Sequence, residues 1–203
     1  MRSRDDVQSR GEAPDLAERI VQRICVFCGS QTGNEPVYAD VAARVGRELA
    51  ARGIGLVYGG GGIGLMGIVA DAVLEAGGEV IGVIPDGLAV QEVMHHGVLD
   101  MRVVAGMHER KALMHSLSDA YLALPGGVGT YEELFEVLAW RQLKIHAKPI
   151  GVLDVAGFFE PFVQVIEMSV VEGFMKPKNR QLFVHGTEPA ELLDSLTAAM
   201  EAV

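Results

Sequence analysis

A strand-to-helix turn with three glycines limits the fold of this chain more than any other segment. Residues 120–124 form an apolar run with β character, Pro-Gly-Gly-Val-Gly-Thr follows at 125–130, and apolar residues then recur at helical spacing through 134–140. Glycines at such a turn let an anion approach the backbone closely, and the amides of the helix N-terminus point at it. The pattern predicts an anion-binding unit, to which Thr130 can add a hydroxyl group.

Glu133 lies about one turn into the expected helix, beside the expected anion. A carboxylate next to a phosphate is electrostatically unfavourable, which suggests that Glu133 acts on another part of the ligand. The alternative is that Thr130-x-x-Glu133 forms a capping box, which needs no ligand. The glycines favour a functional role, because a cap alone does not require Pro-Gly-Gly-x-Gly.

Apolar runs alternate with helical segments along residues 23–203. This alternation predicts one α/β domain, a Rossmann-like doubly wound parallel sheet with helices on both faces. Nearly all the strands are apolar, as expected when both faces of a sheet are covered. Residues 1–22 are polar and are predicted to form a mobile tail and lead-in. The expected strands occupy residues 24–28, 54–58, 79–84, 101–105, 120–124, 149–153 and 182–184.

Four strand ends carry unusual residues. In a parallel sheet with helices on both faces, ligands bind at the carboxyl edge, where these ends lie. These ends are residues 29–30, 59–67, 108–111 and 125–133. The common strand order 3-2-1-4-5 would make the four strands neighbours. We therefore expect all four loops to line one crevice.

Composition and charge exclude several kinds of partner. The chain has 203 residues and a formal net charge of −10, which makes a nucleic acid polymer an unlikely partner, although local amides and arginines can still bind a small anion. No apolar segment is long enough for a signal peptide or a membrane span, so a cytoplasmic location is expected. Cys25 and Cys28 lie within one apolar strand and are expected to be buried free thiols. The histidines have no metal-ligand spacing, so no metal is expected.

A dinucleotide site is a rival interpretation. Residues 62–67 match G-x-G-x-x-G between a strand and a helix, and Asp86 stands where a ribose-binding acid belongs. The chain, however, lacks a second domain for a hydride-transfer substrate and has a second glycine loop at 126–130. Two such loops in one small domain favour a mononucleotide or a phosphosugar.

Arg110 and Lys111 open a helix just after a strand. A cation near a helix N-terminus costs stability unless an anion neutralises it, which makes Arg110 a candidate ligand for the phosphate or ribose. With a nucleoside 5′-monophosphate on residues 127–130, Glu133 would lie near the ribose. A carboxylate there can stabilise an oxocarbenium-like sugar or take a proton from water, and this chemistry requires no cofactor.

The same residues resemble the Lonely Guy (LOG) family of cytokinin riboside 5′-monophosphate phosphoribohydrolases, from residue 24 to the C-terminus. Its signatures are present as Val-Phe-Cys-Gly-Ser at 26–30, the glycine run at 59–67, Met-His-Glu-Arg-Lys at 107–111 and P-G-G-x-G-T-x-x-E at 125–133. The family often has Thr where this chain has Ala139.

The resemblance implies hydrolysis of N6-modified adenosine monophosphate to free base and ribose 5-phosphate, with Arg110 and Glu133 as the catalytic pair. It implies a homodimer or larger assembly with the site near the interface, and the apolar arc of Leu134, Leu138 and Trp140 agrees with this. Trp140 is expected to be poorly exposed. The substrate contacts that it implies are Glu92, Arg110, Lys111, Gly127, Val128, Gly129, Thr130, Tyr131, Glu132 and Glu133, and Ser30, Gly60, Gly61 and Gly126 are candidates for additional nucleotide contacts.

Two alternatives stay open beside this interpretation, and a third is rejected. Many relatives carry the label lysine decarboxylase, which we reject because the sequence shows no pyridoxal-phosphate site and decarboxylation then lacks an electron sink. A general AMP nucleosidase is the alternative among enzymes. A non-catalytic nucleotide or cofactor carrier is the alternative of another class, since related folds bind molybdenum cofactor. Glu133 beside Arg110 favours an enzyme, because a carrier gains nothing from that carboxylate.

Overall fold

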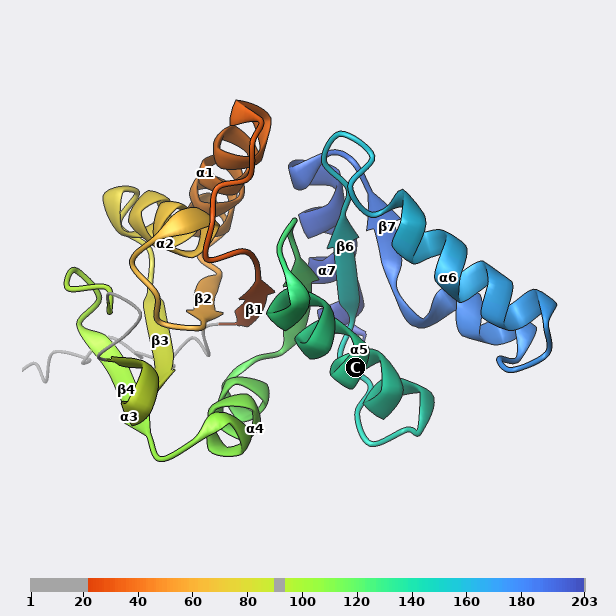
Figure 1. Ribbon diagram of the computed structural model, residues 1–203. Coiled ribbons are helices and arrows are strands. Elements are labelled where there is room, and N and C mark those ends of the chain that lie inside the picture. Colours follow the sequence, from red (N-terminus) through yellow and green to blue (C-terminus); the bar gives the residue numbers. More distant parts are fainter. Residues whose placement is uncertain (1–21, 90–93, 203) are drawn as a thin grey trace, which may run out of the picture.

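The computed structural model describes residues 22–89 and 94–202 of the chain. It contains one seven-stranded sheet in which every pair of neighbouring strands is parallel (Figure 1). The strand order across the sheet is β4-β3-β2-β1-β5-β6-β7. The strands are β1 (Arg23–Phe27), β2 (Gly55–Tyr58), β3 (Val80–Pro85), β4 (Asp100–Val104), β5 (Ala120–Ala123), β6 (Ile150–Leu153) and β7 (Val184–Gly186).

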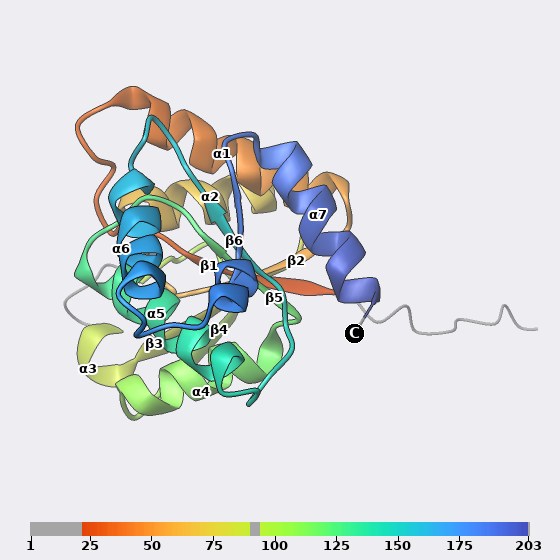
Figure 2. The same ribbon diagram turned by 90° about the vertical axis from the view of Figure 1, so that its right-hand side faces the viewer.

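Helices cover both faces of the sheet, which confirms the predicted doubly wound fold (Figure 2). One layer consists of α1 (Pro36–Ala51), α2 (Gly64–Glu75) and α7 (Pro189–Glu201). The other consists of α4 (Met107–Leu117), α5 (Val128–Gln142) and α6 (Glu160–Val171). Two short helices, α3 (Asp86–Ala89) and η1 (Pro177–Leu182), complete the described elements.

Alternation along the central strands divides the core into two hydrophobic layers. On β1, Ile24 and Val26 pack with the α1, α2 and α7 layer, whereas Cys25 and Phe27 pack with the α4, α5 and α6 layer. Every residue of β2, β3, β5 and β6 is buried, while the edge strands β4 and β7 are partly exposed. Burial on both faces is why the central strands are continuously apolar.

The predicted strand order is wrong in the position of β4. This strand lies at the edge beside β3, whereas the prediction placed it between β1 and β5. The chain adds β2, β3 and β4 on one side of β1, and α4 then leads back to β5 on the other side. The switch in strand order therefore falls between β1 and β5, and α4 lies near the ends of several strands instead of beside its own strand alone.

The short strand predicted at 182–184 begins later than expected. Residues 177–182 form the 3₁₀ helix η1, and β7 follows at Val184–Gly186. Pro177 stands at the first turn of η1, where its missing amide hydrogen costs nothing. The apolar residues at 182–184 therefore span the end of η1 and the start of the edge strand β7.

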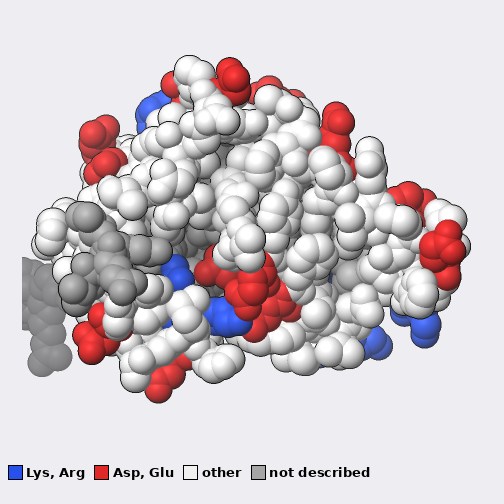
Figure 3. Space-filling view, in the orientation of Figure 1, with Lys and Arg blue, Asp and Glu red and all other residues white. Residues whose placement is uncertain are grey.

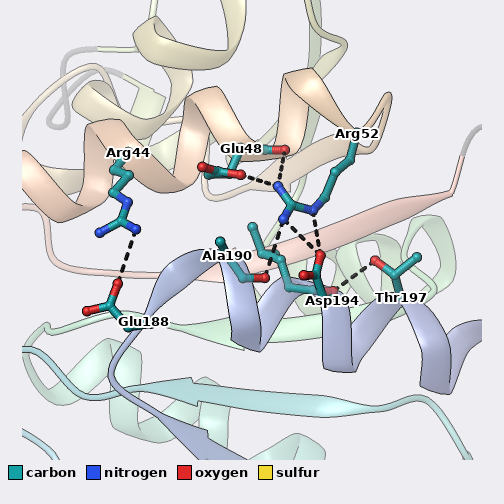
Figure 4. Close-up of polar contacts among 8 residues, drawn as sticks. Arg44, Glu48, Arg52, Glu188, Ala190, Asp194 and Thr197 are labelled. Atoms are coloured by element: carbon teal, nitrogen blue, oxygen red, sulfur yellow. Dashed lines mark hydrogen bonds and ion pairs between the residues drawn. The ribbon is translucent and has the colours of Figure 1, made fainter.

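Ion pairs attach the C-terminal helix α7 to α1 (Figure 4). Arg52 at the end of α1 pairs with Asp194 at 2.8 Å and also with Glu48 on its own helix, and Arg44 pairs with Glu188 at 3.1 Å. These contacts are partly exposed, so each contributes at most about 1 kcal/mol to stability. The buried Leu192, Leu193 and Leu196 of α7 supply most of the attachment.

Cys25 and Cys28 are buried free thiols, as predicted. They belong to different layers of the core, and burial raises the pKa of both thiols. A raised thiol pKa makes the reactive thiolate rare at neutral pH. Within residues 22–89 and 94–202, no helix has the length and apolar content needed to cross a membrane.

Candidate active site

A cleft of about 220 Å³ opens at the carboxyl edge of the sheet, at the switch in strand order. Its walls come from the ends of β1 and β2 and from the first turns of α4 and α5. Arg110 and Glu133 both line it, together with the backbone of residues 127–130. The loops at residues 29–30, 59–67, 108–111 and 125–133 thus contribute to one site, as predicted from the sequence, although the strand order behind that prediction is wrong.

The N-terminus of α5 supplies the amides of this cleft. Gly127 is the N-cap residue, and no side chain caps the helix. Thr130 is therefore in the first turn and buried, and Glu133 lies in the second turn. The capping-box interpretation of Thr130 and Glu133 is wrong, because the N-cap residue is Gly127, three residues before Thr130. Free amides at an uncapped N-terminus favour an anion.

The glycines of this turn have two different roles. A Cβ atom on Gly126 would lie 2.1 Å from Oγ1 of Thr130 and 2.8 Å from the amide nitrogen of Gly29, so packing between β1 and β5 requires glycine there. A Cβ atom on Gly127 or Gly129 would meet nothing within 4 Å, and neither glycine has a positive φ. Neither packing nor backbone strain accounts for these two glycines, which instead leave the backbone open to the cleft.

Arg110 reaches the cleft from α4, and its side chain is 8% exposed. Its Nε donates to the carbonyl of Val83 at 3.2 Å and its Nη2 to the carbonyl of Gly59 at 3.2 Å. Val83 lies in the second half of β3 and Gly59 directly follows β2, so these carbonyls hold the guanidinium group at the carboxyl edge of the sheet. Carbonyl dipoles orient the charge but do not neutralise it, which leaves a buried cation facing the cleft.

Glu133 is the acidic counterpart of Arg110 in the cleft. Burial raises the pKa of this carboxyl group to about 7, and the nearby guanidinium of Arg110 works against that rise. Among the described residues, no group donates a hydrogen bond to Glu133, and no ion pair joins it to Arg110. The two side chains therefore face a shared space, and the carboxyl group can change its protonation near neutral pH.

Lys111, the neighbour of Arg110, points to α5. Its ammonium group lies 2.5 Å from Oε1 of Glu132 and 2.9 Å from Oε1 of Glu136, and the side chain is 12% exposed. These two hydrogen bonds raise the pKa of Lys111. Figure 3 shows acidic and basic side chains gathered side by side in the middle of this face. Glu132 also lines the cleft, whereas Lys111 does not; Lys111 lines a small adjoining hollow with Trp140 and Glu133.

The glycine run at 59–67 packs against the chain itself. A Cβ atom on Gly64 would lie 2.2 Å from the backbone carbon of Ser30, and one on Gly67 would lie 2.5 Å from the carbonyl oxygen of Gly62. Gly64 lets the start of α2 pack against the loop after β1, and Gly67 lets it pack against the loop after β2. Asp86 is exposed at the start of α3 and lies outside the cleft lining. Packing thus accounts for two of the three glycines of the G-x-G-x-x-G pattern, and Gly64 also has a φ of +64°.

The remaining predicted contacts lie at different places. Ser30 lines the cleft, and Gly126 lines a second cleft described below. Gly60 and Gly61 are buried and line neither cleft. The carbonyl of Gly60 accepts a hydrogen bond from the amide of His95, and Gly61 pairs with Met94. The ring of Tyr131 stacks on Phe158, with centroids 6.2 Å apart. Glu92 lies outside the residues that the structure describes.

Sequence analysis missed the second cleft, of about 230 Å³, which shares Gly29, Ser30 and Gly127 with the first. Tyr38, Leu65 and Phe158 give it an apolar wall. No local pattern could reveal it, because Tyr38 and Phe158 meet only through tertiary packing, with ring centroids 6.0 Å apart. Ala139, the departure from the family pattern, lines the groove between α5 and α6 and neither cleft.

The fold and the cleft define a Rossmann-like α/β protein whose anion-binding helix N-terminus lies beside an arginine and a protonatable carboxyl group. Residues 66–196 match the family described as "Possible lysine decarboxylase". The cytokinin riboside 5′-monophosphate phosphoribohydrolase LOG of Oryza sativa subsp. japonica is 52% identical over 172 residues, which are 85% of this chain and 71% of the rice protein. A phosphoribohydrolase of the same name from Arabidopsis thaliana, LOG5, is 49% identical over 184 residues, which are 91% of this chain and 81% of that protein. The chain belongs to the LOG family.

Solved structures support the same fold. The molybdenum cofactor carrier protein of Chlamydomonas reinhardtii has a TM-score of 0.68 at 20% identity, over 89% of this chain and 99% of that one. The molybdenum cofactor binding protein of Rippkaea orientalis has a TM-score of 0.67 at 21% identity, over 88% and 96%. At these identities the likeness concerns the fold alone.

Proposed function

We propose that the protein hydrolyses the N-glycosidic bond of N6-modified adenosine 5′-monophosphate, releasing the free base and ribose 5-phosphate. The observation that carries this proposal is the placement of Arg110 and Glu133 on one cleft, unpaired with each other, beside the uncapped N-terminus of α5. The relatives named as phosphoribohydrolases, at about half identity over most of this chain, support the same reaction.

The substrate phosphate binds on the amides of residues 127–130. Gly127 and Gly129 present bare backbone to the cleft, and the hydroxyl of Thr130 lies beside these amides. The N-terminal end of the α5 dipole favours the dianion. Ser30 lines the opposite wall and contributes a further hydroxyl group.

Glu133 and Arg110 carry the chemistry at the ribose. The bond between the base nitrogen and C1′ breaks, water bonds to C1′, and the base leaves with a proton. Ionised Glu133 stabilises the positive charge that develops on the sugar and accepts the proton of the attacking water. Arg110, held by two carbonyl groups, binds the phosphate or ribose in a fixed orientation.

Lysine decarboxylation is a poor fit to these residues. A pyridoxal-phosphate enzyme needs a lysine amine that can form a Schiff base. The lysine beside this cleft is Lys111, whose ammonium group is held by two carboxylates that raise its pKa. A lysine amine activated for a Schiff base requires the opposite shift.

We also propose that the protein is at least a homodimer and is cytoplasmic. Leu134 and Leu138, which motivated the dimer, are buried against the sheet, and Trp140 is partly buried. Among the exposed apolar residues, four lie on α5 and α6 and form what we call the α5–α6 face: Phe135, Val165, Met168 and Val171. A second copy that covers this face would remove that apolar area from water. Two buried free thiols are consistent with a reducing compartment.

Hydrolysis of a substrate panel tests the proposed function. The purified protein is incubated with AMP, N6-isopentenyl AMP, GMP and the nucleosides that correspond to each, and free base and ribose 5-phosphate are measured. We expect the N6-modified monophosphate to be cleaved fastest, and each monophosphate at least ~100-fold better than its nucleoside, because the helix N-terminus binds the phosphate.

The same panel separates the alternatives. Equal cleavage of AMP and its N6-modified form would identify a general AMP nucleosidase. Tight binding of AMP without release of base would identify a carrier. Equal rates on monophosphate and nucleoside would contradict the assignment of residues 127–130 to the phosphate.

A further inference from the structure

The charged residues around Glu133 form a connected set that the proposed reaction does not use directly. Lys111 on α4 bridges Glu132 and Glu136 on α5. Glu132 and Glu136 are four residues apart, so they lie on one face of the helix one turn apart. Glu133 lies between them in the chain and points into the cleft.

We infer that Lys111 is a positioning residue: it ties Glu132 and Glu136 to α4 and thereby holds Glu133 opposite Arg110, without contacting the substrate. This role differs from the direct contact that the family resemblance implies. It rests on the proposed function for its kinetic readout alone.

Connectivity between the helices supports the inference. Arg110 is fixed at the sheet edge by the carbonyls of Val83 and Gly59, so its helix is anchored on one side. Lys111, the next residue, makes both of its ion pairs to α5. One turn of α4 therefore holds Arg110 against the sheet and, through Lys111, holds α5 close to Arg110.

Burial of the ammonium group is the second support. Lys111 is 12% exposed and does not line the cleft; it lines a small hollow that it shares with Cys25, Trp140 and Glu133. A ligand in the cleft would have to draw the ammonium group away from these two carboxylates to bind it closely. Breaking a partly buried ion pair in this way is costly, because it leaves two negative charges without a partner.

Charge balance gives the inference a distinctive signature. The charged groups that face Glu133 are Arg110 and Lys111 from α4 and Glu132 and Glu136 from α5. Cys25 and Cys28 face it from β1 as neutral thiols. Loss of Lys111 should raise the pKa of Glu133 further, because two carboxylates lose their counter-charge, whereas loss of the Glu136 charge should lower it.

Carboxyl NMR titration of ¹³C-glutamate-labelled protein tests this signature without any substrate. The Glu133 signal is assigned by its absence in Glu133→Gln, and its midpoint is followed in Lys111→Met, Glu136→Gln and the double variant. We expect the midpoint to rise in the first, fall in the second and return toward the native value in the double variant. Lys178→Met, an exposed lysine on η1, is the matched control and should leave it unchanged.

Kinetics with AMP distinguish positioning from substrate contact. Lys111→Met should lower kcat with KM within ~3-fold of native, and Lys111→Arg should restore most of the activity, because a guanidinium group can also bridge two carboxylates. A direct contact with phosphate predicts instead that KM rises by ~10-fold or more with kcat less affected.

Two outcomes would overturn the inference: that rise in KM, or a Glu133 midpoint that neither Lys111→Met nor Glu136→Gln shifts. If Lys111→Met fails to fold, Glu136→Gln still tests the coupling, since the downward shift requires no loss of the lysine. If the native protein cleaves no nucleotide, the proposed function fails, while the titration still shows whether the Lys111 bridge is coupled to Glu133.

Discussion

The guanidinium group of Arg110 occupies the space that a side chain at Gly59 would need. A Cβ atom on Gly59 would lie 2.0 Å from Nη2 of Arg110 and 3.2 Å from Sδ of Met66. The glycine at the end of β2 is therefore required by an arginine that is distant in sequence, and its carbonyl is also one of the two acceptors that hold the arginine. Gly59 therefore helps to position Arg110 even though it has no side chain that could contact a substrate.

Gly59→Ala should displace Arg110 and reduce kcat/KM for the monophosphate by about 100-fold, because small misplacements of a positioned group carry losses of that order. The fold should survive, since the displaced group borders a cleft. Gly87→Ala is the matched control, because a Cβ atom there meets nothing within 4 Å. Steady-state kinetics and circular dichroism of both variants provide the check, and unchanged kcat/KM in Gly59→Ala would refute the role of this close contact.

Glu133→Gln should reduce turnover by at least ~100-fold while AMP binding is kept, because the amide retains the shape but cannot carry negative charge toward the sugar. Binding should tighten slightly, since a carboxylate near the phosphate has been neutralised. Single-turnover kinetics and isothermal calorimetry measure the two effects separately. Native-like turnover in this variant would end the proposed mechanism.

The same substitution should change how stability depends on pH. Burial raises the pKa of Glu133 to about 7 from an ordinary value near 4.5, so the folded state binds the proton more tightly than the unfolded chain does. Stability from this group is fully present below about pH 4.5 and is lost as the pH rises through 7. The free energy of unfolding of native protein should therefore fall by about 2 to 3 kcal/mol from pH 5 to pH 8 because of this group. Glu133→Gln should not show this fall, so its stability relative to native protein should rise by the same amount.

Urea unfolding at both pH values measures that gain. A helix cap at Glu133 would instead predict a loss of about 1 kcal/mol on substitution. If the free energy of unfolding changes equally with pH in both proteins, burial does not raise the pKa of Glu133.

Met168→Glu should convert the proposed dimer to a monomer, because it places a charge on the α5–α6 face, where Met168 is 59% exposed. Val103→Glu, on the exposed side of edge strand β4, is the control and should leave the assembly intact. Light scattering of native and variant proteins decides. A monomeric native protein would refute the assembly, and a dimeric Met168→Glu would place the interface elsewhere.

Local sequence patterns were sufficient to predict most elements of the fold. Continuous apolar runs such as 54–58 and 120–124 mark strands that are buried on both faces, and their period and length identify them without any tertiary information. The order of the strands could not be obtained in this way. The position of β4 depends on where the chain crosses the sheet, and nothing within residues 101–105 specifies its neighbour.

The candidate site was predictable to the same extent. Residues 126–130 and Glu133 belong to one contiguous segment, so their arrangement follows from a strand, a turn and a helix. The partners of Lys111 and the carbonyl acceptors of Arg110 come from other elements, and no local pattern encodes them. The capping-box interpretation failed for a related reason: its spacing matched, but the start of α5 was set by Gly127.

The chain places β2 to β4 on one side of β1 and β5 to β7 on the other, and this order determines when the site can form during folding. Ile24 pairs with Ala120, so the two central strands must meet across the whole β2 to α4 segment. A nascent chain that has released β1 to β4 has paired strands on one side of β1 but no α5 amides and no Glu133. Nucleotide can therefore act as a folding ligand only after α5 has left the ribosome, and chains truncated before that point gain no protection from it.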